Sequence, residues 1–203
     1  MVYDEKRILA DIRARLGDHR YEHSLNVAAS AKALAEKYGG DTEVCYVAGL
    51  LHDVLKEQPR DETLEFFSQN GIVLTELEMS APKLWHAVAG AAYIKKYYPE
   101  LPDAAADAVR YHTTGKADMS IEEKILFTAD FISADRDYPG VDEMRRRAED
   151  SLESAMKEGL RFTVAELSEK CAPIHPDTVD AYNFILLENR KPFILNERNR
   201  KNG

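Results

Sequence analysis

The sequence has few cysteines, no long apolar run and no excess of positive charge, and each absence excludes a class of protein. Its two cysteines, Cys45 and Cys171, show neither CxxC spacing nor a disulfide framework, so we expect two free, packed thiols. No stretch approaches the roughly 20 apolar residues that cross a bilayer. The formal net charge of −9 opposes binding along the phosphate backbone of DNA or RNA.

Targeting and repeat signals are also missing. The first residues lack the apolar core and small-residue cleavage site of a secretory signal, so we expect a cytoplasmic protein. There is no internal repeat, no Gly/Ser-rich linker and no convincing strand pattern. At 203 residues the chain is long enough to bury a core without disulfides. We therefore predict one all-α domain, a helical bundle over residues 1–203.

Helical periodicity runs through most of the chain, punctuated by glycine and proline. One helix is expected to begin with Ser120 as N-cap and Glu123 in a capping box. The apolar spacing predicts helices at about 4–16, 20–38, 42–56, 82–98, 103–112, from 120 onward, 141–158, 163–171 and 177–190. We expect a catalytic core at about 18–137, with C-terminal helices at about 141–190 packed on it as scaffold.

Four of the six histidines and two aspartates lie on apolar faces of these helices. They are His23, His52, Asp53, His86, His112 and Asp130. A single helical histidine is more often a packed residue, but four of them with two aspartates are hard to explain by packing. The adjacent His52 and Asp53 point about 100° apart on a helix, so both can reach one ion between them. The pattern predicts a metal site.

The types of ligand narrow the chemistry. Imidazole and carboxylate donors without cysteine suit Fe, Mn, Co, Ni or Zn and argue against the usual structural zinc site. A bound ion lowers the pKa of its water from about 15.7 toward roughly 7, so hydrolysis of a phosphoester or phosphoanhydride is a natural use. Two of the histidines keep simpler alternatives. His86 could fill space beside Trp85, and His112 could hydrogen-bond to the turn that follows it.

The ordered set of His23, the pair His52-Asp53, and Asp130 resembles the H…HD…D signature of HD-domain metal-dependent phosphohydrolases. Longer motifs resemble the YqeK family over roughly residues 5–190. These motifs are Arg20-Tyr21-Glu22-His23-Ser24, Leu50-Leu51-His52-Asp53 with Lys56, Tyr111-His112-Thr113-Thr114-Gly115, and Ala129-Asp130-Phe131-Ile132 with Arg136. The resemblance implies an HD-type helical bundle.

That family is known as symmetrical diadenosine tetraphosphate (Ap4A) hydrolases, which carry iron-type centres and split Ap4A into two ADP. The resemblance implies iron, with manganese or cobalt as alternatives, and one or two ions per chain. The ligands implied for one metal are His23, His52, Asp53 and Asp130. For a second metal the resemblance adds His86 and His112.

The same resemblance suggests catalytic and substrate-binding residues. Asp53 is a candidate to orient the nucleophile, and His52 and Lys56 are placed beside it in the catalytic machinery. The substrate-binding candidates are Arg20, Lys56, His112, Thr113, Thr114, Gly115 and Arg136. Residues 113–115 keep the alternative of a simple helix stop. The segment 132–136 departs from the family's common Glu-Pro before the arginine, which leaves the roles of Ser133 and Asp135 unassigned.

We predict a metal-dependent hydrolase that cleaves Ap4A and related dinucleoside polyphosphates symmetrically. Alternatives are another HD-type nucleotide phosphatase or phosphodiesterase, a nucleotide-sensing protein without turnover, and a purely structural metal. The expected partners are a dinucleoside polyphosphate or a nucleoside diphosphate, with no DNA, RNA or membrane. The sequence leaves the oligomeric state open, with a homodimer among the alternatives.

Overall fold

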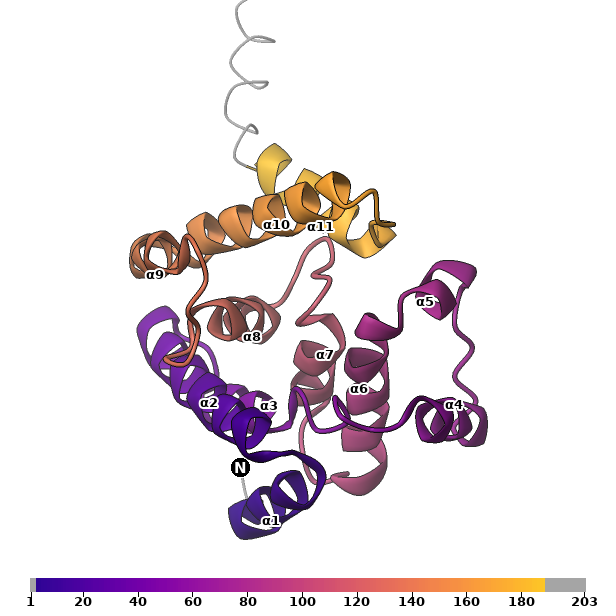
Figure 1. The fold of residues 1–203 in the computed structure, drawn as a ribbon. Helices are drawn as coiled ribbons and strands as arrows, with labels where there is room; N and C mark the ends of the chain where they lie inside the picture. The colour runs from indigo at the N-terminus through magenta and orange to yellow at the C-terminus, as the bar shows by residue number, and fades with distance from the viewer. Residues whose placement is uncertain (1–2, 189–203) are drawn as a thin grey trace, which may run out of the picture.

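The computed structural model describes residues 3–188, and every regular element in that range is a helix (Figure 1). The elements are α1 (Glu5–Arg15), α2 (Asp18–Tyr38), α3 (Thr42–Leu51), α4 (Arg60–Gln69), α5 (Glu76–Ser80), the 3-10 helix η1 (Pro82–Leu84), α6 (Trp85–Tyr97), α7 (Asp103–Tyr111), α8 (Ile121–Ile132), α9 (Val141–Asp150), α10 (Leu152–Glu169) and α11 (Pro176–Glu188). The all-α prediction is confirmed. None of the described helices is long and apolar enough to span a membrane.

Helices α2, α3, α7 and α8 form the centre of the bundle, and α6 packs against α7. Helices α2 and α3 pack closely against each other. A Cβ atom added to Gly49 would lie 2.5 Å from the Ala28 Cα and 2.8 Å from its backbone nitrogen. Only glycine permits this distance, because backbone atoms cannot turn aside as a flexible side chain can. Gly49 therefore sets how closely the two central helices pack.

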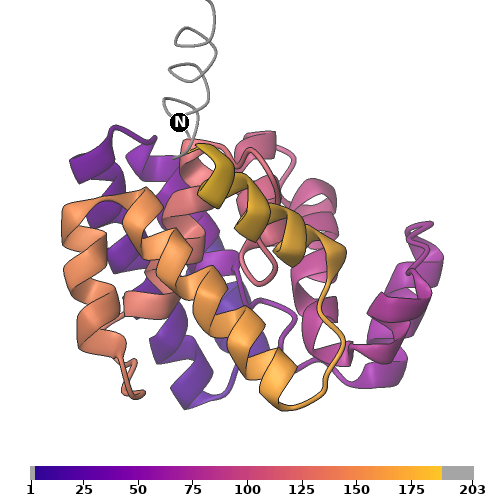
Figure 2. The same ribbon diagram turned by 90° about the horizontal axis from the view of Figure 1, so that it is seen from above.

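Helices α9, α10 and α11 lie over α8, whereas α4 and α5 lie at the far side of α6 (Figures 1 and 2). Helices α4 and α5 fall in a stretch to which the sequence analysis assigned no element. The C-terminal helices have a small apolar cluster of their own against α8. Its members are Met119, Phe127, Met156, Leu160, Ala181 and Ile185.

The helix expected at about 42–56 ends earlier than predicted. Helix α3 stops at Leu51, and residues 52–57 continue as tight turns. Two of these turns are closed by backbone hydrogen bonds, from Val54 to Leu51 (3.1 Å) and from Lys56 to Asp53 (2.8 Å). His52 and Asp53 therefore lie just beyond the helix rather than inside it, so the predicted helical angle between them does not apply.

The predicted break between residues 158 and 163 is wrong, because α10 is continuous from Leu152 to Glu169. The chain breaks at Ser151, which is extended and caps the Ser154 nitrogen. Gly159 does not end the helix. A Cβ there would lie 2.8 Å from the Met144 Cε, so this glycine permits close packing. The last two residues of the helix expected at 177–190 lie outside the described range.

The two cysteines have different environments. Cys45 is buried and free, as expected, and burial raises the pKa of its thiol to about 12. Cys171 is free but exposed, so the expectation of a packed thiol is wrong there. Cys171 lies at the surface, in the turn that follows α10, and its backbone has a positive φ of 50°.

Candidate metal centre

The structure brings all six predicted ligands to one place between α2, α3, α6, α7 and α8. Each lies on or beside the end of one of these helices. His23 is in the second turn of α2, His52 and Asp53 follow α3, His86 is in the first turn of α6, His112 follows α7, and Asp130 is in the last turn of α8. The four histidines and Asp53 are at most 4% exposed, and the Asp130 side chain is 19% exposed.

Three of the histidines are held by an oxygen on their Nδ1 side. His52 Nδ1 lies 2.7 Å from the Gly49 carbonyl oxygen, and His112 Nδ1 lies 2.7 Å from that of Val109. A carbonyl only accepts, so each Nδ1 carries the proton and each Nε2 keeps its lone pair. The Nε2 of His52 is buried and has no hydrogen-bond partner. An unsatisfied, preoriented imidazole nitrogen of this kind fits a metal ligand.

His23 is held by a carboxylate instead. Its Nδ1 lies 2.7 Å from the Asp135 Oδ2, and its Nε2 lies 3.0 Å from the Asp130 Oδ1. Donation from Nδ1 to Asp135 leaves Nε2 directed at the same space as the other imidazoles. Ligating histidines commonly donate their second N–H to a carboxylate in this way. Asp135, which the sequence left without a role, therefore orients His23.

The donor atoms form two overlapping groups that share His52. One contains His23, His52 and Asp130, the other His52, Asp53 and His112, and within each group the donor atoms lie within 4.8 Å of one another. His86 extends the second group. Its Nε2 lies 3.2 Å from the Asp53 Oδ1 and 3.1 Å from the His112 Nε2. Six donors in this arrangement could hold one or two ions.

Three cations expected to bind substrate surround the two carboxylates. Arg20 Nη1 lies 2.9 Å from the Asp53 Oδ2, and Lys56 Nζ lies 3.7 Å from the Asp53 Oδ1. Arg136 forms an ion pair with the Asp130 carboxylate and donates from Nε to its carbonyl (2.7 Å). The positive charge needed by an anionic substrate is therefore concentrated locally, although the chain carries a formal charge of −9.

The protonation states fit metal binding. Burial, and next the neighbouring His52, lower the pKa of His112 to about 4. Burial and the neighbouring His112 hold the pKa of His86 well below its usual value. Burial alone would raise the pKa of Asp53, but its interactions with His52 first, and then with Lys56 and His86, lower it well below its usual value. At neutral pH these groups are therefore neutral imidazoles and a carboxylate, the forms that coordinate metal.

For Thr114 and Gly115, the structure favours the simpler alternative, in which residues 113–115 only end a helix. The Thr114 hydroxyl donates to the Gly115 carbonyl (2.9 Å), and Gly115 has a φ of +65°. A Cβ on Gly115 would lie 3.2 Å from Ala181, so this turn packs against α11. Thr113 differs, because its hydroxyl is buried and has no hydrogen-bond partner. Substrate contact by this loop stays a prediction that depends on Thr113.

A cationic pocket of about 280 Å³ opens beside His86 and Lys56. Arg60 and Lys83 also line it, and the Arg60 guanidinium lies over the ring of Trp85, 5.4 Å from its centroid. Sequence reasoning did not single out Arg60 or Lys83, because both look like ordinary surface cations. The fold places them next to the predicted ligands.

Comparison with known proteins agrees with this geometry. The sequence profile of the HD domain matches residues 20–135, a range that contains all six candidate ligands. The chain belongs to the HD domain family. An HD domain with these His/Asp groups is a metal-dependent phosphohydrolase.

The similarity extends beyond the HD domain itself. A Bacillus subtilis protein named bis(5'-nucleosyl)-tetraphosphatase, symmetrical, is 33% identical over 90% of this chain and 98% of its own length. A protein of the same name from Halalkalibacterium halodurans is 34% identical over 88% of this chain and 95% of its own length. A Clostridium acetobutylicum structure, described as a predicted HD superfamily hydrolase involved in NAD metabolism, superposes with a TM-score of 0.88 at 32% identity and covers 93% of this chain and 100% of its own.

The contact between Asp135 and His23 leads to a test of this HD centre. Replacing Asp135 with asparagine keeps an oxygen that can accept from Nδ1 but removes the charge, whereas leucine removes both. Loss of such a supporting contact typically weakens metal binding about 10–100-fold. We expect the affinity for Mn²⁺, measured by competition with a chelator, to fall in the order wild type, Asp135→Asn, Asp135→Leu.

Asp137→Asn is the matched control, because Asp137 is exposed and makes no hydrogen bond or ion pair within the described residues. Its Mn²⁺ affinity should equal that of the wild type. If the Asp135 variants bound Mn²⁺ as tightly as this control, Asp135 would not orient a metal ligand.

Proposed function

We propose that this HD domain protein is a symmetrical bis(5'-nucleosyl)-tetraphosphatase, which hydrolyses Ap4A and related dinucleoside polyphosphates to nucleoside diphosphates. One observation carries the proposal: two metal-donor groups share His52 and are surrounded by Arg20, Lys56 and Arg136. A tetraphosphate needs both features, metal ligands at the bond that breaks and cations along the chain on either side. Relatives of this name match over nearly the whole chain.

The residues of the metal centre would have different roles in the reaction. When bound, a transition metal supplies Lewis acidity to the phosphoryl oxygens and lowers the pKa of its water toward about 7. The imidazole Nε2 atoms would hold it, since their Nδ1 atoms are fixed by Asp135, Gly49 and Val109. Asp53 lies close to the cations Arg20 and Lys56. It also lies close to the imidazoles of His52, His86 and His112, so it is placed to orient the attacking water.

The three cations would serve the phosphates. Arg20 and Arg136 present fixed guanidinium groups, and Lys56 is a point charge between Asp53 and His86. Burial lowers the pKa of Lys56. Charge-assisted hydrogen bonds from such groups stabilise the charge that develops on a leaving nucleoside diphosphate. Central cleavage follows if the cations hold equal lengths of phosphate chain on the two sides of the metal ligands.

Finer points of the proposal come from the sequence. We infer iron as the native metal, with manganese or cobalt as alternatives, since His and Asp ligands suit all three. A cytoplasmic location, the oligomeric state and the exclusion of nucleic acid as a substrate stay predictions.

Chromatography of the products tests the proposal directly. Protein loaded with iron, manganese or cobalt is incubated with Ap4A, and we expect ADP as the sole nucleotide product. ATP together with AMP would contradict symmetrical cleavage. Release of inorganic phosphate from a nucleoside monophosphate, without turnover of Ap4A, would favour another HD-type phosphatase. Binding of Ap4A without turnover in metal-loaded protein would favour a nucleotide sensor.

A further inference from the structure

A second pocket, lined mainly by aromatic side chains, adjoins the candidate metal centre on the side of α8. It measures about 220 Å³ and is lined by Asp130, Phe131, Arg136, Tyr138 and Phe162. We call this pocket the aromatic pocket, after the rings of Phe131, Tyr138 and Phe162 that line it. Two of its lining residues, Asp130 and Arg136, belong to the metal centre already described. The pocket therefore opens directly onto the place where phosphate would bind.

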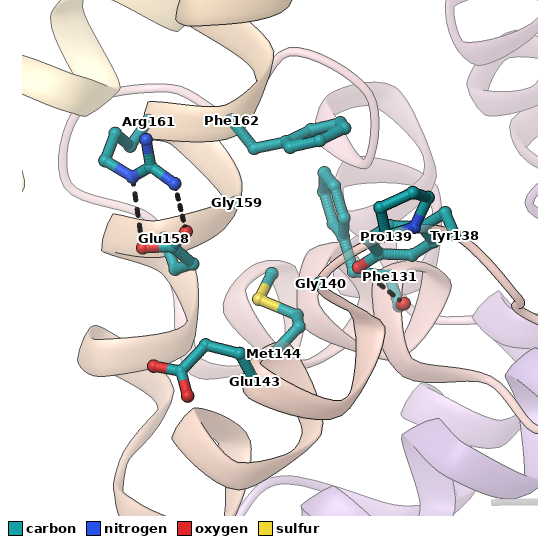
Figure 3. Close-up of a pocket in the computed structure, with 10 residues that line it drawn as sticks. All are labelled: Phe131, Tyr138, Pro139, Gly140, Glu143, Met144, Glu158, Gly159, Arg161 and Phe162. Carbon is teal, nitrogen blue, oxygen red and sulfur yellow. Dashed lines mark hydrogen bonds and ion pairs between the residues drawn. The ribbon is translucent and has the colours of Figure 1, made fainter.

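The rings are held in place before any ligand arrives. Tyr138 and Phe162 lie with their centroids 5.7 Å apart, and the Tyr138 hydroxyl donates to the Phe131 carbonyl (3.1 Å; Figure 3). Arg145 anchors the loop that carries Tyr138. Its guanidinium donates to the carbonyls of Ile132, Ser133 and Arg136 at 3.0–3.2 Å.

Phe162 is unusual because it is a large apolar side chain with 38% of its surface exposed. It comes from α10, in the part of the chain that the sequence analysis treated as scaffold. Its ring nevertheless extends toward Phe131 and Tyr138 rather than away into solvent (Figure 3). An exposed aromatic ring beside a charged site is suited to stack on a flat ligand.

The neighbouring hollow behind the same rings is a poorer site. It measures only about 90 Å³, and Glu143 and Glu158 line it (Figure 3). Carboxylates would repel a phosphorylated ligand, and Glu158 is already paired with Arg161. The aromatic pocket has the opposite character, because Arg136 stands at its edge next to the metal centre.

Two unlike pockets thus flank the metal centre. The cationic pocket shares His86 with it, and the aromatic pocket shares Asp130. A pocket of about 220 Å³ is smaller than the 300–1,000 Å³ that usually enclose a whole small-molecule ligand. It suits one flat part of a longer molecule, with the charged part continuing past Arg136 toward the metal ligands.

We propose that the aromatic pocket takes the nucleobase of one nucleoside diphosphate half of the substrate, by stacking on Phe162 and Tyr138. Arg136 then lies where the phosphates attached to that nucleoside lead into the metal centre. The inference rests on the proposed function, since it assigns a subsite for that substrate. It also gives α10 a direct part in binding.

Calorimetric titration separates the base from the phosphates. Mn²⁺-loaded wild type, Phe162→Ala and Phe162→Tyr are each titrated with ADP and with inorganic pyrophosphate, which has no base. Stacking on one aromatic side chain typically contributes enough that its loss weakens binding about tenfold or more. We expect Phe162→Ala to bind ADP about tenfold more weakly, Phe162→Tyr to bind it like wild type, and pyrophosphate binding to stay unchanged in both.

Tyr97→Ala is the control, since Tyr97 is a 41% exposed aromatic at the end of α6 and lines neither pocket. It should leave both affinities unchanged. Unchanged ADP binding by Phe162→Ala, or equal weakening of ADP and pyrophosphate, would overturn the base subsite and leave the proposed function standing. Failure of the metal-loaded wild type to hydrolyse Ap4A to ADP would overturn the proposed function, and the subsite with it.

Discussion

Replacing Asp53 with alanine is expected to abolish the hydrolysis of Ap4A while the helical fold stays intact. Asp53 is the carboxylate that joins the parts of the centre. Its Oδ1 lies 3.2 Å from the His86 Nε2 and 3.9 Å from the His112 Nε2. Its Oδ2 lies 3.4 Å from the His52 Nε2 and 2.9 Å from Arg20. Alanine removes a donor from the second group and the partner of two cations.

The expected loss in kcat is large. A metal ion contributes several kcal/mol to transition-state stabilisation, and about 4 kcal/mol corresponds to roughly 10³-fold in rate. We expect at least this loss, measured as ADP release by metal-loaded protein at saturating Ap4A. Asp53→Asn keeps the side-chain volume and one oxygen, so it separates loss of the ligand from loss of packing. It should fall close to alanine, because the charge is missing in both.

Two controls make the result interpretable. Circular dichroism should show wild-type helix content in Asp53→Ala, because the carboxylate is a site group and the apolar core does not depend on it. Asp137→Ala, a change at an exposed aspartate seven residues beyond Asp130, should keep full activity. Wild-type turnover by Asp53→Ala would remove the His52-Asp53 pair from the mechanism and return the choice to a structural metal or a sensor.

Local signals in the sequence predicted much of the bundle. The capping box of Ser120 and Glu123 is present at the start of α8, and Asp41 caps α3 through two backbone nitrogens. Gly39 ends α2 with a φ of 80°. Each of these depends on residues within one helical turn, so the sequence alone contains the information.

The predicted helix boundaries were wrong where tertiary contacts determine the local structure. A helix end was predicted after residue 158, but Gly159 lies within α10, where Met144 and Phe127 pack close to it. The turns after Leu51 replace a helix that periodicity alone would continue, and they place Lys56 Nζ 3.1 Å from the His86 Nε2. Both features bring residues that are distant in the sequence into contact, and helical periodicity does not show such contacts.

The candidate site could also be predicted only in part from the sequence. The six candidate ligands and their order could be predicted from the sequence, because histidines and aspartates on apolar helix faces are conspicuous. Asp135 and Phe162 could not, since an acidic residue in a loop and a phenylalanine in a long helix are ordinary. Only the fold brings Asp135 to His23 and Phe162 beside Tyr138. Residues that position ligands or line pockets are recognised by contact rather than by type.

Replacing Gly49 with alanine is expected to lower the free energy of unfolding by about 2–4 kcal/mol, the range of severe overpacking. In a helix interior alanine normally gains about 1 kcal/mol over glycine, so local propensity predicts the opposite sign. The clash decides, because the new Cβ would meet the Ala28 backbone at 2.5 Å. Urea unfolding at neutral pH measures the difference, and the melting temperature should fall by about 4–16 °C.

Gly90→Ala is the matched control, since Gly90 is also inside a helix but its nearest neighbour is a side-chain methyl group of Val109 at 3.1 Å. That group can shift, so the expected change is within about 1 kcal/mol of wild type. Adding Ala28→Gly to Gly49→Ala should not restore stability, because it removes the contact at 3.2 Å and leaves those with the backbone. Full rescue would show that the contact with the Ala28 Cβ carries the clash, and wild-type stability of Gly49→Ala itself would show that α2 and α3 separate easily. The Gly49 carbonyl also holds His52 Nδ1, so separation of these helices should weaken Mn²⁺ binding together with the fold.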